Sequence, residues 1–271
     1  MLRKGDLTQG GITGTLLHFT LPMLVGSFLQ QCYNIADTLI VGQCIGAGAL
    51  AAVGSAYTLM VFLISVLLGL AMGSGTVFSL HYGAGNHVAL RRSIFSSFVL
   101  IGIVTLILNV AVFIWLDPIL RLLQVPQDIY GMMRSYLWII FCGIVFTFIY
   151  NFYASLLRAV GDSVTPLWFL AVSVVLNIAL DLFFILQLDW GIQGAAAATV
   201  LAQGVAALGI IIYTYRRRPE LRWHHEDMCF DRTCLKEIAS FSTLTCIQQS
   251  VMNLGILMVQ GLSLIHISEP T

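Results

Sequence analysis

The chain has 271 residues, of which 58% are hydrophobic and only 10% are charged, whereas a soluble domain carries about 25% charged residues. Together with a mean hydropathy of +0.90, this composition excludes an ordinary soluble domain and predicts a polytopic membrane protein. The formal net charge is zero, but the charges are distributed unevenly along the chain.

Seven apolar stretches are each long enough to cross a hydrocarbon core of about 30 Å, which takes about 20 residues of helix. They lack the alternating pattern of a lipid-facing barrel strand, so we expect an all-α fold. In chain order, the stretches cover residues 16–41, 50–80, 93–115, 135–156, 166–187, 192–214 and 238–261.

Lysine and arginine are distributed unevenly among the predicted loops. Only Arg121 and Arg134 lie on loops that follow odd-numbered stretches. The N-terminal tail and the other loops carry Arg3, Lys4, Arg91, Arg92, Arg158, Arg216, Arg217, Arg218, Arg222, Arg232 and Lys236. Cytoplasmic loops hold the excess of positive charge, so we expect a multi-pass cell-membrane protein with a cytoplasmic N-terminus. The triplet from Arg216 to Arg218 is interpreted as an orientation signal rather than a site for nucleic acid or anionic lipid.

The first apolar stretch carries a polar stripe. Gln30, Asn34 and Asp37 lie four and three residues apart and therefore share one helix face. An aspartate at the centre of a membrane helix raises the free energy of membrane insertion by about 2.5 to 3.5 kcal/mol, whereas each leucine lowers it by only about 0.3 to 0.6 kcal/mol. Such a residue therefore indicates a functional site. Pro22 cannot donate to the carbonyl of His18, so we expect a bend there, which is either a hinge or a static kink.

The fifth and sixth stretches carry similar stripes, with Asn177 and Asp181 on one and Thr199 and Gln203 on the other. At about 1.5 Å per residue, Asp37, Asp181 and Thr199 lie roughly 8, 9 and 12 Å below the outer membrane surface. These side chains share one layer of the membrane. With the Asn177 amide they predict an oxygen-only cluster, which suits a hard cation rather than a soft metal.

Two carboxylates in a poorly hydrated site cannot both stay charged without compensation. A proton or Na⁺ restores the balance, so we interpret the cluster as a coupling-ion site that needs no cofactor and no transition metal. The alternative is that Asn177 and Asp181 only hydrogen-bond neighbouring helices. The spacing of Cys229 and Cys234, with two nearby histidines, matches no common zinc pattern.

After six stretches the sequence begins to repeat. The pair Gln30 and Gln31 recurs as Gln248 and Gln249, as expected for a parallel repeat. We expect residues 1–216 to form a six-helix N-terminal lobe, residues 217–237 a cytoplasmic loop between lobes, and residues 238–261 the first helix of a second lobe whose remainder is missing. Residues 262–271, LSLIHISEPT, look like a translated sequencing-library adapter. We expect them to be a non-native tail that interrupts the helix.

Five motifs resemble the multidrug and toxic compound extrusion (MATE) family, in the order in which that family carries them. They are LPMLVGSFLQQCYNIADTLIVGQCIGAGALAAVGSA from Leu21, MGSGTVFSLHYGAGN from Met72, LLRAVGDSVTP from Leu156, LNIALDLFFI from Leu176 and GIQGAAAATVLAQ from Gly191. The resemblance implies two facing six-helix bundles with alternating access. It also implies export of organic cations and drugs, driven by sodium or proton entry.

The cation-site positions of the family's N-terminal lobe match Asp37, Asn177, Asp181 and Thr199. The DinF-like branch is the most similar one, because residues 238–261 contain no Asp or Glu. The resemblance also implies that a chain without its C-terminal lobe cannot alternate, so this fragment is expected to be inactive alone.

The sequence therefore predicts a secondary active multidrug antiporter rather than an enzyme, with small-molecule drugs and membrane lipid as its partners. Candidate residues of the substrate cavity are Gln30, Tyr33, Asn34 and Gln203. The alternative within the same broad fold group is a flippase of lipid-linked oligosaccharides. Such a protein would be expected to line its cavity with Lys or Arg, and the central portions of these stretches contain neither. A purely structural protein leaves the insertion cost of the two aspartates unexplained.

Overall fold

The computed structural model describes residues 12–223 and 232–268, which form helices without any strand. This confirms the expected all-α fold class. The elements are α1 (Ile12–Cys44), α2 (Ala47–Gly83), α3 (His87–Leu122), α4 (Gln127–Cys142), α5 (Ile144–Ala159), α6 (Val164–Leu182), the π-helix η1 (Phe183–Gln187), α7 (Gly191–Arg217), the 3-10 turn η2 (Pro219–Leu221) and α8 (Arg232–Ser268).

Each of the seven expected stretches lies within a helix, but the fourth stretch is divided. In the described part of the chain, α2, α3, α6 with η1, and α7 are long and apolar enough to cross a membrane. The pair α4 and α5 makes a fifth span that bends by 47° at Gly143. Although α1 has 33 residues, it is not in this set.

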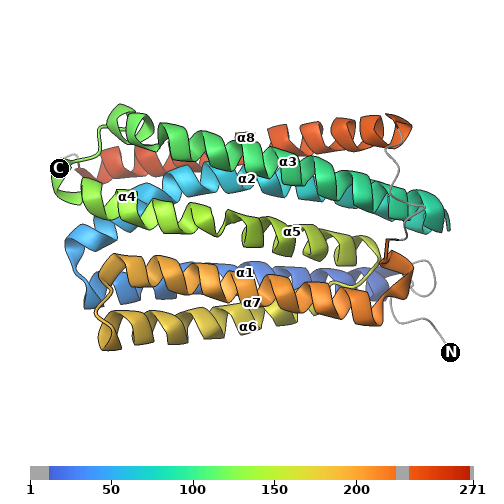
Figure 1. Cartoon of the computed structure of the whole chain (residues 1–271), viewed down its shortest axis with the longest axis horizontal. Coiled ribbons are helices and arrows are strands. Elements are labelled where there is room, and N and C mark those ends of the chain that lie inside the picture. The colour runs from blue at the N-terminus through green and yellow to red at the C-terminus, as the bar shows by residue number, and fades with distance from the viewer. Residues whose placement is uncertain (1–11, 224–231, 269–271) are drawn as a thin grey trace.

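The helices lie side by side along the long axis of one bundle, and α4 and α5 follow each other in the same direction (Figure 1). On one side, α1 and α7 pack against α6, and on the other side α3 and α8 pack against α2. The bent pair α4 and α5 lies between them and contacts both α2 and α7. The polar stripes of α1, α6 and α7 consequently face one shared region of the bundle interior.

The end of α6 departs from the expected plain α-helix. From Phe183 to Gln187, directly after Asp181 and Leu182, the helix widens into a π-helical turn. Such π-helical turns are rare and often occur at functional sites, but no residue type in a sequence predicts them. The apolar run FFILQ therefore gave no signal of this change.

The α2–α8 contact is unusually close because α2 presents glycines to α8. A side chain at Gly69 or Gly73 would collide with backbone atoms of Cys246 or Ser242, respectively. Nearer the start of α8, Ser93 Oγ of α3 lies 3.0 Å from Cys234 Sγ. Small residues allow helices to approach closely in membranes, where their backbones then gain van der Waals contact.

The prediction that the tail interrupts the last helix is wrong, because α8 continues to Ser268. Residues 262–267 contain neither proline nor glycine, and the first proline of the tail is Pro270. A helix therefore meets no backbone obstacle before that point. Residues 269–271 lie outside the described part of the chain.

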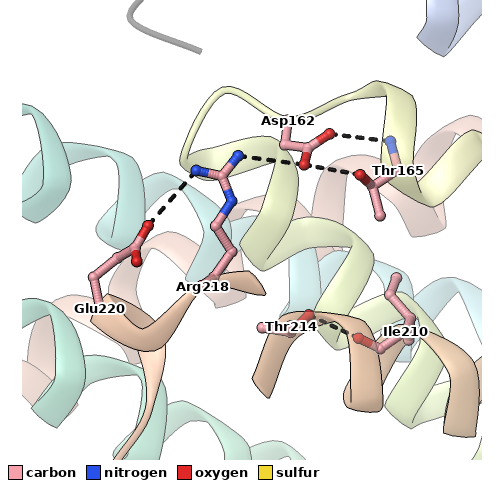
Figure 2. Close-up of polar contacts among 6 residues, drawn as sticks. All are labelled: Asp162, Thr165, Ile210, Thr214, Arg218 and Glu220. Carbon is pink, nitrogen blue, oxygen red and sulfur yellow. Dashed lines mark hydrogen bonds and ion pairs between the residues drawn. The ribbon is translucent and has the colours of Figure 1, made fainter. Parts of the chain in front are cut away.

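A polar network joins the α5–α6 loop to the end of α7 (Figure 2). Asp162 Oδ1 accepts from the Thr165 backbone N–H at 3.0 Å, and Asp162 Oδ2 accepts from Thr165 Oγ1 at 2.8 Å. Arg218 lies 3.4 Å from Asp162 Oδ2 and 3.6 Å from Glu220 Oε1. Arg218 is therefore held by two carboxylates, beyond any contribution to membrane orientation.

We expect Asp162→Ala to lower the free energy of unfolding by about 1 to 2 kcal/mol, because the first turn of α6 loses its side-chain acceptor. Asp162→Asn keeps one acceptor oxygen for Thr165 but loses the ion pair and the second acceptor, so its loss of stability should be smaller than that of Asp162→Ala. Thermal unfolding of the purified protein in detergent measures both. Equal midpoints for the wild type and Asp162→Ala would contradict a stabilising role for this network.

A buried carboxyl pair as candidate functional site

Two aspartates from different helices meet inside the bundle. Asp37 is 8% exposed on α1 and Asp181 is fully buried on α6, and their carboxyl groups are within hydrogen-bond reach of each other. The Oδ1 atom of each is buried without a hydrogen-bond partner. A buried carboxyl oxygen without a donor is costly, so this pair is suited to a small positive species.

Asn177 and Thr199 lie beside the carboxyl pair, as the polar stripes predict. Asn177 is 1% exposed, and its amide fits best with the nitrogen donating to Asp181 Oδ2 at 3.0 Å. The amide oxygen then accepts from the Thr199 backbone N–H at 3.2 Å. The structure thus brings together the four residues expected at the coupling site, contributed by α1, α6 and α7.

Two tyrosines also belong to this region. The hydroxyl of Tyr33 lies 3.3 Å from Thr199 Oγ1, so Tyr33 sits at the cluster itself, although the sequence placed it only among the cavity candidates. Tyr136 of α4 is 4% exposed and interacts electrostatically with Asp37 and Asp181. Sequence reasoning missed Tyr136, because α4 carries no polar stripe around it.

The other cavity candidates are spread along the helices. Gln203 lies one helical turn from Thr199 on α7, and Thr147 Oγ1 of α5 donates to Gln203 Oε1 at 3.0 Å. Asn34 donates to Gln31 Oε1 on the same helix at 3.1 Å, and Gln30 is half-buried. The structure therefore joins Gln203 to α5, whereas the described contact of the Asn34 side chain stays within α1.

Pro22 lies inside α1, which extends unbroken from Ile12 to Cys44. The neighbouring turns remain helical although proline removes one backbone donor. A hinge at Pro22 stays a prediction.

The atoms that could bind an ion at this site are carboxyl, amide and hydroxyl oxygens. In the described ranges, no three His, Cys, Asp or Glu side chains gather closely enough to hold a metal ion. Oxygen donors suit a proton or a hard cation, whereas soft metals prefer thiolate and imidazole. The residues His224, His225 and Cys229, considered above as a zinc pattern with Cys234, lie outside the described part of the chain.

The fold and its apolar helices define an all-α, multi-pass membrane protein. The chain belongs to the MatE family, whose model matches residues 22–183. Its relatives are transporters rather than enzymes.

Two relatives from Bacillus subtilis are similar along most of the chain. The probable multidrug resistance protein YpnP is 36% identical over 217 residues, which cover 80% of this chain and 49% of that protein. The probable multidrug resistance protein YoeA is 30% identical over 255 residues, covering 93% of this chain and 53% of that protein. The chain thus spans about half the length of the curated relatives that it matches.

Solved structures share the fold. The outward-facing conformation of a MATE transporter of the MOP superfamily superimposes with a TM-score of 0.89 at 24% identity, over 97% of this chain and 59% of that one. The inward-facing conformation of a multidrug resistance MATE transporter gives a TM-score of 0.78 at 24% identity, over 89% of this chain and 55% of that one.

Proposed function

We propose that the full-length protein is a secondary active antiporter that exports organic cations and drugs in exchange for Na⁺ or H⁺. The observation that carries this proposal is the contact between Asp37 and Asp181 inside the bundle, with one unpartnered oxygen on each. A hydrogen bond between two carboxyl groups needs one proton, so the pair accommodates a single positive charge. Either a proton or Na⁺ can supply that charge.

In this proposal, Asp37 and Asp181 bear the coupling charge, while Asn177 and Thr199 complete its coordination. Tyr33 and Gln203 lie next to them and are proposed, with Gln30 and Asn34, as cavity residues for the drug. The protein would lie in the cell membrane with its N-terminus in the cytoplasm. This orientation is supported by the excess of Lys and Arg on one set of loops.

The proposed function also requires a second lobe. The chain spans about half the length of its relatives. In the proposed full-length protein, α8 would be the first helix of the C-terminal lobe. Its residues Leu244, Ile247 and Val251 are more than half exposed. They would contact lipid or the remainder of that lobe, and the fragment alone would not transport.

The test is ethidium efflux from proteoliposomes that contain the full-length protein, with sodium and proton gradients imposed separately. We expect one of the two gradients to accelerate efflux at least tenfold, because ion entry supplies the free energy for drug exit. An ionophore specific for that ion should remove the acceleration. Efflux at the same rate under either gradient and under none would overturn antiport.

A further inference from the structure

Gly143 is the one residue between α4 and α5, at the 47° bend of the fourth span. It is buried, and α7 passes directly beside it. A Cβ atom at this position would collide with Val200 Cγ2, and it would lie 2.7 Å from Cγ1 and 3.0 Å from Cβ of the same residue. The absence of a side chain at the bend therefore sets how closely α7 approaches α4 and α5.

Val200 cannot easily turn aside to make room for such an atom. A β-branched side chain in a helix has one strongly preferred χ1 rotamer, so its methyl groups stay where the backbone places them. Carbon atoms need about 3.5 to 4.0 Å between them. A methyl group at Gly143 would therefore displace α7 itself rather than one flexible side chain.

Thr199 precedes Val200 in the sequence and contacts Tyr33 and Asn177, which lie beside the carboxyl pair of Asp37 and Asp181. Thr199 Oγ1 lies 3.3 Å from the Tyr33 hydroxyl, and its backbone N–H lies 3.2 Å from the Asn177 amide oxygen. Both distances are already near the upper limit for hydrogen bonds. A shift of α7 at residue 200 would thus alter the contacts that orient Asn177 toward Asp181.

We propose that Gly143 is a positioning residue for the ion site: it lets Val200 pack against the bend and so holds Thr199 in register with Asn177 and Tyr33. This inference rests on the proposed function. It assigns to the bend in the fourth span a specific effect on ion affinity, with no direct contact between Gly143 and the ion.

The test compares ion dependence with drug dependence in the full-length protein. Gly143→Ala should raise the half-saturating concentration of the driving ion about tenfold, while the half-saturating ethidium concentration changes less than twofold. Adding Val200→Ala to Gly143→Ala removes the two methyl groups and should restore most of the ion affinity. A purely structural defect would lower the amount of active protein without shifting the ion half-saturation.

Gly204→Ala is the matched control. Gly204 lies on α7, the helix that carries Val200. A Cβ at Gly204 would lie 3.7 Å from the Phe146 ring, which is an ordinary van der Waals contact. Its ion half-saturation should match that of the wild type. If Gly143→Ala does not accumulate in the membrane, Val200→Leu enlarges the same contact from the other side and should shift the ion half-saturation in the same direction.

The outcomes separate the two proposals. An ion-driven wild type, together with an unshifted ion half-saturation in Gly143→Ala or Val200→Leu, overturns the positioning role alone. A shift in Gly143→Ala that Val200→Ala fails to reverse also overturns it, because the effect then does not pass through that contact. Efflux that no ion gradient drives in the wild type overturns the proposed function, and this inference with it.

Discussion

Asp37→Asn in the full-length protein should reduce ion-driven dye efflux at least tenfold while leaving the protein in the membrane. The amide has nearly the same shape as the carboxyl group, so the packing of α1 against α6 is retained. It cannot bind or release a proton, however, and it carries no charge to neutralise a cation. The Asp37–Asp181 pair would then lose the positive species that couples the two fluxes.

The measurement is the initial rate of ethidium efflux, normalised to the amount of protein in the membrane. A tenfold loss corresponds to about 1.4 kcal/mol in the barrier for transport. The matched control is Asp117→Asn near the C-terminal end of α3, where the carboxylate is exposed and bonded to Arg134. Exposed ion pairs contribute about 0 to 1 kcal/mol, so this variant should stay within twofold of the wild type.

Undiminished efflux by Asp37→Asn at a normal expression level would contradict the coupling role. An equal loss in Asp117→Asn would also count against it, because removal of any carboxylate would then have the same effect. The two variants change the same chemical group on different helices, so the comparison isolates the buried position of Asp37.

Gly73→Ala should destabilise the protein by about 1 to 3 kcal/mol, as overpacked cores do. A Cβ at Gly73 would lie 2.6 Å from the backbone nitrogen of Ser242 and 2.8 Å from the carbonyl carbon of Phe241. Backbone atoms cannot rotate away, so α8 has to move off α2. That movement would also disturb the hydrogen bond from Ser242 Oγ to the Leu70 carbonyl, at 3.2 Å.

Thermal unfolding in detergent measures this change, which should appear as a midpoint lowered by several degrees. Gly54→Ala is the control on the same helix, since a Cβ there meets no atom within 4 Å. Alanine has the higher helix propensity, so this variant should be as stable as the wild type or slightly more so. Matching midpoints for Gly73→Ala and Gly54→Ala would refute the close α2–α8 approach.

The carboxyl cluster could be predicted because its signal lies within single helices. Asn177 and Asp181 are four residues apart, and Asp37 stands out against an apolar background in which each polar residue must find an interior partner. Counting residues from the membrane surface then predicts that Asp37, Asp181 and Thr199 lie at a similar depth. Helix periodicity and insertion energies are sufficient for that step, and they need no knowledge of which helices touch.

Contacts between helices could not be predicted in the same way. Tyr136 gave no signal, because its role depends on where α4 lies relative to α1. Glycine at position 143 looks the same in sequence whether it faces lipid or Val200, and the π-helical turn after Asp181 has no residue code. Such features depend on distances between segments that are far apart in the chain, and periodicity carries no information about those distances.

The pairing of Ser93 with Cys234 has a practical consequence. Three other cysteines, Cys32, Cys44 and Cys142, are exposed, whereas Cys234 is buried against α3. Any rearrangement that lifts the start of α8 away from α3 must uncover this thiol. The chain thus carries a natural chemical reporter at the junction between its two proposed halves, and once the exposed thiols have been blocked an alkylating reagent could follow their separation there.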